Sequence, residues 1–92
     1  MDILYTREPI VGEKFEFEVV DFIGKAYVEV RVGGKVIRKK ECPDPPCHQV
    51  FGITRDLRGQ TLTISAYDTS GDQRIIELTV IDYNNETTTL DA

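Results

Sequence analysis

The sequence is poor in several features that common protein classes require. Its 92 residues include no tryptophan, one histidine and two cysteines. No apolar run approaches the roughly 18 residues that a transmembrane helix needs, so we predict no insertion into a membrane. The opening residues 1–8 (MDILYTRE) also lack the basic and apolar segments of a secretory signal.

Positive charge is scarcer than negative charge in this chain. The chain has 11 Lys and Arg against 16 Asp and Glu, which gives a net charge of −5 at pH 7. Because nucleic-acid binding depends on clustered Lys and Arg, we predict no nucleic-acid partner. The basic cluster Arg38-Lys39-Lys40 lies in an expected strand, where charge protects a sheet edge against aggregation.

Recognisable catalytic and nucleotide-binding patterns are missing as well. No Ser-His-Asp arrangement, phosphate-binding loop or dinucleotide-binding glycine pattern can be read from the chain. No helical pattern follows the Gly33-Gly34 pair, so this pair indicates a tight hairpin turn and not a phosphate cradle. We therefore expect a protein that is not an enzyme and that requires no cofactor.

Alternation of apolar and polar residues is the main positive signal. A strand places successive side chains on opposite faces of a sheet, so a period of two predicts half-buried strands. About seven short runs separated by turn signals predict an all-β sandwich or barrel. These runs are residues 3–8, 15–20, 26–32, 35–40, 50–54, 60–67 and 74–82.

Prolines and composition divide the chain further. Pro9 lacks the N–H that a strand ladder needs, which places it at a sheet edge or at a switch between sheets. Three prolines within residues 43–46 predict that residues 41–49 form no regular structure. We expect one sandwich domain over residues 1–82 and a flexible tail or linker over residues 83–92.

The run from Leu57 to Asp72, LRGQTLTISAYDTSGD, resembles the terminal strands of bacterial and archaeal immunoglobulin-like domains. In those families a Leu and a Gly precede a strand that ends in Ala-x-Asp, and a Ser-Gly or Ala-Gly turn follows. Residues 9–20, with Gly12 before an alternating strand, are similar to their opening. The resemblance covers most of residues 9–82 and implies an immunoglobulin-like β-sandwich of about seven antiparallel strands.

The resemblance also carries a functional expectation. Such domains are typically non-catalytic spacers or binding modules of cell-surface and secreted proteins. It therefore implies an extracellular or cell-surface location, with neighbouring domains or another protein as partners. Strand addition at the edge formed by residues 3–8 is one expected binding mode. The chain departs from antibody domains because it lacks a core Trp and a widely spaced cysteine pair.

Two alternative functions remain open. The first is an accessory domain of a secreted hydrolase that binds substrate or carbohydrate. This function predicts exposed aromatic residues in line on one sheet, but the tyrosines are scattered at positions 5, 27, 67 and 83. The second is a Cys/His metal-binding protein centred on Cys42, Cys47 and His48.

Cys42 and Cys47 enclose Pro-Asp-Pro-Pro and admit three interpretations. A disulfide would close a short loop and contribute roughly 2 kcal/mol in an oxidising compartment. The cysteines could instead form a reduced, inert pair. They could also bind zinc with His48 and Asp44, although the second pair of ligands that zinc sites normally use is missing.

Acidic residues suggest a possible calcium site. In an immunoglobulin-like topology, Asp21, Asp68 and Asp72 would lie in loops at the same pole of the sandwich. Asp is also common in turns because its side chain accepts hydrogen bonds from nearby backbone N–H groups. The Phe22-Ile23 pair at this pole is expected either to cap the core or to form an exposed apolar contact. In the tail, Asn85 begins an N-glycosylation sequon.

Overall fold

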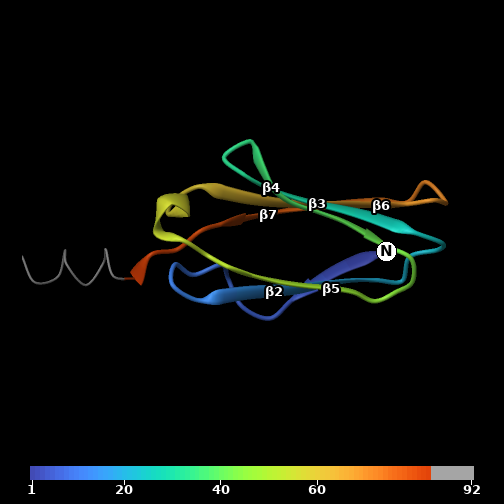
Figure 1. Ribbon diagram of the computed structural model, residues 1–92, viewed down its shortest axis with the longest axis horizontal. Helices are drawn as coiled ribbons and strands as arrows, with labels where there is room; N and C mark the ends of the chain where they lie inside the picture. Colours follow the sequence, from blue (N-terminus) through green and yellow to red (C-terminus); the bar gives the residue numbers. More distant parts are fainter. Residues whose placement is uncertain (84–92) are drawn as a thin grey trace, which may run out of the picture.

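The structure is a computed structural model that describes residues 1–83 and consists of β-strands with one 3₁₀ turn. The strands form two layers that face each other (Figure 1). The all-β sandwich predicted from sequence alternation is therefore confirmed. Its elements are β1 (Asp2–Tyr5), β2 (Lys14–Val20), β3 (Ala26–Val32), β4 (Lys35–Cys42), β5 (Cys47–Gly52), η1 (Arg55–Leu57), β6 (Thr61–Asp68) and β7 (Gln73–Thr79).

Both sheets are antiparallel. One has the strand order β1-β2-β5, and the other has the order β4-β3-β6-β7. The chain changes sheet after β2, after β4 and again after β5, so each sheet joins strands that are distant in sequence. β6 and β7 form a hairpin at one edge of the larger sheet, as the turn at Ser70-Gly71 predicted.

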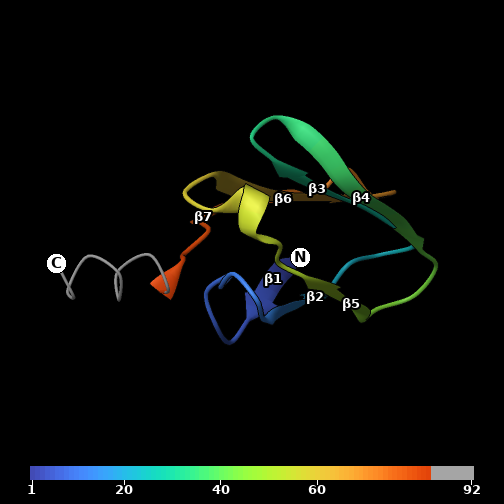
Figure 2. The same cartoon turned by 60° about the vertical axis from the view of Figure 1, so that its left-hand side comes forward.

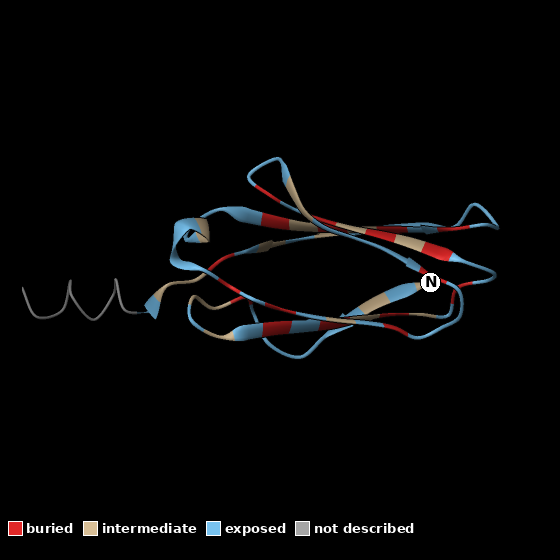
Figure 3. Cartoon of the chain, in the orientation of Figure 1, coloured by how far each residue is buried: buried red, intermediate tan, exposed pale blue. Residues whose placement is uncertain are grey.

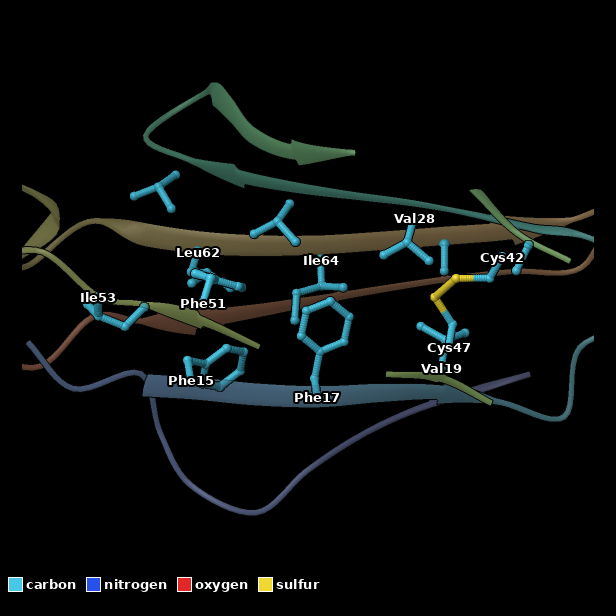
Figure 4. Close-up of a cluster of buried hydrophobic side chains, with 14 of the residues drawn as sticks. Phe15, Phe17, Val19, Val28, Cys42, Cys47, Phe51, Ile53, Leu62 and Ile64 are labelled. Atoms are coloured by element: carbon cyan, nitrogen blue, oxygen red, sulfur yellow. A yellow bond between two sulfur atoms is a disulfide. The ribbon is translucent and has the colours of Figure 1, made fainter. Parts of the chain in front are cut away.

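The core lies between the two layers, and Figure 3 shows buried positions alternating with exposed ones along the strands. The ring centroid of Phe15 lies 6.0 Å from that of Phe17 and 5.8 Å from that of Phe51. Leu62 and Ile64 face these rings from the opposite sheet (Figure 4). Burying one side chain of this size contributes about 1.5–3 kcal/mol, so these residues hold the layers together.

Pro9 marks a switch between the sheets, as its missing N–H predicted. β1 pairs with β2 in one sheet, and the chain then turns at the buried Pro9 toward the other. The Val11 N–H donates to the Ile81 carbonyl at 2.9 Å, and the Ile81 N–H donates to the Pro9 carbonyl at 2.9 Å. This short contact is parallel, and it joins the first and last parts of the sandwich.

Several expected strand boundaries were wrong, and the first strand ends at Tyr5 instead of residue 8. Residues 41–49 are not wholly irregular, because β4 extends to Cys42 and β5 begins at Cys47. The three prolines are confined to the connection between these strands, where no ladder N–H is required. The last strand ends at Thr79, short of residue 82. Val80 still exchanges hydrogen bonds with Gly59 and Gln60, and Ile81 pairs with Pro9 and Val11.

Candidate functional site

Asp68, at the end of β6, organises one pole of the sandwich. Its side chain is buried, with 4% of the residue exposed. Its Oδ1 accepts hydrogen bonds from the Ser70 hydroxyl at 2.6 Å, the Ser70 N–H at 2.9 Å and the Asp72 N–H at 3.1 Å. Its Oδ2 accepts from the Ile23 N–H at 3.1 Å. The Ser70 hydroxyl, followed by the Ile23 N–H, lowers the pKa of Asp68 from 3.8 to about 2.

Phe22 and Ile23 each take one of the two roles that the sequence left open, capping the core and forming an exposed apolar contact. Phe22 is buried and caps the core, whereas Ile23 is 69% exposed. The backbone of Ile23 is held on both sides, because its N–H donates to Asp68 and its carbonyl accepts from the Thr69 hydroxyl at 3.1 Å. Ile23 therefore projects from a loop that is tied to the β6–β7 turn.

The other two candidate calcium ligands have separate surroundings. Asp72 accepts from its neighbour Gln73 N–H at 2.9 Å and pairs with the amine of Met1 at 2.9 Å. Asp21 adopts a positive φ of 56° in the preceding loop. Within residues 1–83, no group of three or more His, Cys, Asp or Glu side chains is placed to hold a metal ion. The sequence suggested either a calcium site or turn chemistry for these residues, and the turn role of Asp68 is visible in its hydrogen bonds.

Cys42 and Cys47 form a disulfide, as the first of the three interpretations predicted. Cys42 ends β4 and Cys47 begins β5, and their Cα atoms are 5.8 Å apart. Both residues are buried, and the bond joins edge strands that belong to different sheets (Figure 4). In this oxidised form the two sulfurs bond each other, so neither is a free thiolate for a metal or a substrate.

His48 lies on the opposite face of β5 from the disulfide. Cys47 points into the core, whereas the adjacent His48 is exposed, since neighbouring residues of a strand alternate in direction. The His48 Nε2 lies 2.7 Å from Oε2 of Glu16 on β2. The sequence neighbours Cys47 and His48 are therefore not brought together as a nucleophile and base or as ligands of one ion.

An aromatic pair on the outer face of the larger sheet was missed by sequence reasoning. Tyr27 on β3 is the register partner of Tyr67 on β6, and their rings stack with centroids 5.0 Å apart. Tyr67 is 55% exposed. A surface hollow of about 330 Å³ lies beside the pair and includes Glu29, Lys39 and Ser65. Each strand alone predicts an outward tyrosine, but only the β3–β6 pairing makes them neighbours.

Comparison with known proteins gives no assignment: the chain matches no family model, no curated protein and no solved structure. Within the described part of the chain, no helix has the length and apolar character needed to cross a membrane. The predicted glycosylation site at Asn85 lies outside the residues that the structure describes. Functional interpretation consequently depends on the geometry of residues 1–83.

Proposed function

We propose that this chain is a non-catalytic immunoglobulin-like module of a cell-surface or secreted protein. It acts as a spacer or as a protein-binding domain toward neighbouring domains or another protein. The strand arrangement carries this proposal. The order β1-β2-β5 facing β4-β3-β6-β7 resembles the division of strands between the two sheets of immunoglobulin-like sandwiches. In this comparison β4 is the additional strand that pairs with β3 at the edge of the larger sheet.

The chemistry of the polar residues supports a structural module. Asp68 has both carboxylate oxygens engaged by donors of the adjoining loops. Cys42 and Cys47 are consumed by the disulfide. The residue types that most often carry catalysis therefore serve the fold at these positions.

The disulfide supports the proposed location. Disulfides persist in oxidising compartments and are rare in the cytosol, where thiols are kept reduced. Cys42 and Cys47 account for both cysteines of the chain, so a reducing compartment would leave the pair without a bond. An extracellular or cell-surface module fits this chemistry.

Thiol trapping in intact cells of the source organism tests this proposal. The epitope-tagged parent protein is alkylated with a membrane-impermeant maleimide, denatured, reduced and alkylated again with a second label. We expect both cysteines to take only the second label and the protein to be accessible to external protease. Immediate labelling of both thiols after lysis, in a protease-protected cytosolic fraction, would contradict the proposal.

A specific observation favours a second function, the accessory carbohydrate-binding domain. The exposed Tyr67, stacked on the half-buried Tyr27, offers a ring surface and hydroxyl groups to a sugar. Glu29, Lys39 and Ser65 supply hydrogen-bonding groups beside them. Oligosaccharide titration followed by NMR tests this function. Binding should be lost in Tyr67→Ala and retained in Tyr67→Phe, and absence of any shift near Tyr67 would exclude it.

A further inference from the structure

An open groove separates the edge strands β4 and β5. The space amounts to about 510 Å³ and includes the apolar side chains of Ile37, Phe51 and Leu57. Lys35 and Arg38 lie along its β4 side, and the Arg38 guanidinium carbon is 5.9 Å from the centroid of the Phe51 ring. Figure 2 shows the β3–β4 hairpin rising away from β5, which opens the space. We call this space the β4–β5 groove.

A β-bulge determines which side chains of β4 line the groove. Val30 pairs with Arg38, but the next residue, Arg31, pairs with Val36, so Ile37 is an extra residue in β4. The bulge places Arg38 on the same face as the buried Val30, the side that faces the core. Arg38 is nevertheless exposed, and its guanidinium lies over the buried Phe51 ring at the surface of the groove.

Both walls of the groove are sheet edges. β4 is the outermost strand of one sheet and β5 the outermost strand of the other, so each leaves backbone groups without a strand partner. The Cys42–Cys47 disulfide ties the two strands together at one end. The disulfide thus holds the strands together at that end, and β4 diverges from β5 away from it (Figure 2).

The charge of the groove contrasts with that of the whole chain. The groove lining includes two cations, Lys35 and Arg38, in a chain with a net charge of −5, whereas Lys39 and Lys40 of β4 line the hollow beside Tyr27 and Tyr67. Asp56 is the acidic residue at the groove. A local excess of cations beside apolar side chains attracts an acidic ligand that also has apolar groups to bury.

We infer that the β4–β5 groove binds an extended acidic peptide segment of a protein partner. Its apolar side chains pack against the half-buried Ile37 and Leu57, its carboxylates face Lys35 and Arg38, and its backbone pairs with a free strand edge. An anionic polysaccharide would use the cations but not the apolar surface or the strand edge. This inference rests on the proposed protein-binding function and specifies its surface and the chemistry of the partner.

Fluorescence anisotropy and NMR with a synthetic peptide test the inference. The probe is a labelled peptide of about eight residues, a common strand length, in which Glu alternates with Val or Leu. Its control has Lys in place of Glu. We expect the acidic peptide to bind with shifts at Ile37, Arg38 and Phe51, and the basic peptide not to bind.

Matched charge reversals locate the contact. Arg38→Glu should weaken binding of the acidic peptide about tenfold, since it replaces a facing cation by a like charge. Arg74→Glu makes the same change on exposed β7, at the opposite edge of the larger sheet from β4, and should leave the affinity within about twofold because distant charges are screened. The NMR spectrum of each variant reports whether the sandwich remains folded.

Three results would overturn the inference. They are no peptide binding at millimolar concentration, equal loss of affinity in both variants, and preferential binding of a sulfated oligosaccharide without shifts at Phe51. Thiol trapping tests the surface-module proposal separately. A peptide failure with an oxidised, externally accessible protein rejects only the groove, whereas a reduced cytosolic protein rejects the module proposal itself.

Discussion

Asp68 is a buried carboxylate whose ionised form the fold requires. Three N–H groups and one hydroxyl donate to it, from Ile23, Ser70 and Asp72. Because these donors favour the charged form, its pKa in the folded protein is about 2, below the ordinary value of 3.8. A carboxylate with a lowered folded pKa stabilises the protein above its unfolded pKa, and this contribution disappears as the pH falls through the folded value.

We therefore predict that acid weakens the sandwich in the window set by Asp68. The free energy of unfolding should fall as the pH drops from 3.8 toward about 2. Asp68→Asn should lower stability at neutral pH, because its amide nitrogen would meet the Ile23 N–H, and it should flatten this part of the pH profile. Urea denaturation across this range measures both effects. An unchanged acid slope in the variant would refute the role of Asp68.

Gly24 lies at the same pole as Asp68, and Gly59, which precedes the other end of β6, is a matched control for it. Both have nearly equal positive φ angles, 73° and 72°. An added Cβ at Gly59 meets no atom within 4 Å, but at Gly24 it would meet the Thr69 hydroxyl that donates to Ile23. Replacement by Ala should cost about 1 kcal/mol at Gly59 from the backbone alone. Gly24→Ala should cost about 1 kcal/mol more, because that hydrogen bond is disrupted.

Thermal or urea denaturation of Gly24→Ala and Gly59→Ala measures the difference. Equal losses in both variants would mean that only the backbone conformation matters. In the NMR spectrum of Gly24→Ala, changes in chemical shift should be confined to the loop at Ile23 and the β6–β7 turn. These two segments are joined by the hydrogen bond from Thr69 to Ile23.

The disulfide acts on a pair of strands. It closes a short loop, with its cysteines five positions apart, and ties an edge of one sheet to an edge of the other. Restriction of the unfolded chain by a loop of this length contributes about 2 kcal/mol. We predict that reduced protein, and Cys42→Ala/Cys47→Ala, unfold at lower urea concentration by this free energy. A reductant should not affect the double variant, and equal stability of oxidised and reduced protein would contradict the prediction.

Strand positions were predictable from sequence because burial acts on each strand separately. Residues 26–32 alternate so regularly that the predicted strand has the bounds of β3, Ala26–Val32. The β-bulge at Ile37 was not predictable, since it exists only in the pairing of β4 with β3. The bulge leaves both Val36 and Ile37 half-buried, whereas strict alternation would bury only one of two adjacent residues.

The candidate sites also divide into features set by local sequence and features set by pairing between distant strands. Local sequence predicted the turn role of Asp68 and the Cys42–Cys47 bond, because both involve residues close together in the chain. The Tyr27–Tyr67 stack and the Arg38–Phe51 contact depend on pairing between distant segments. Alternation states which face a side chain occupies, but it does not state which strand lies beside it.

The whole domain should be insensitive to calcium. The Asp68 oxygens already accept hydrogen bonds, so a cation would have to displace donors that hold the pole together. We predict the same melting temperature in millimolar calcium and in EDTA, measured by circular dichroism. A rise with calcium that is abolished in Asp21→Asn would instead establish the calcium site that the sequence suggested.

Val80 and Ile81 are the last residues that contribute core packing and backbone pairing to the sandwich, so the chain should tolerate truncation only after them. Val80 is 2% exposed, and Ile81 pairs with the segment that follows Pro9. Removal of residues 84–92 should therefore change the melting temperature by less than about 2 °C. Removal of residues 80–92 loses the buried Val80, worth about 1.5–3 kcal/mol, and should lower the melting temperature by roughly 10–20 °C.

Calorimetry of the two truncated chains beside the full chain decides the position of the boundary. A large destabilisation on removal of residues 84–92 would place part of the folding unit beyond the predicted limit at residue 82. Little effect on removal of residues 80–92 would mean that the parallel contact between the ends is dispensable. We expect stability to depend on that contact, which joins the first and last segments of the chain together with the ion pair of Met1 and Asp72.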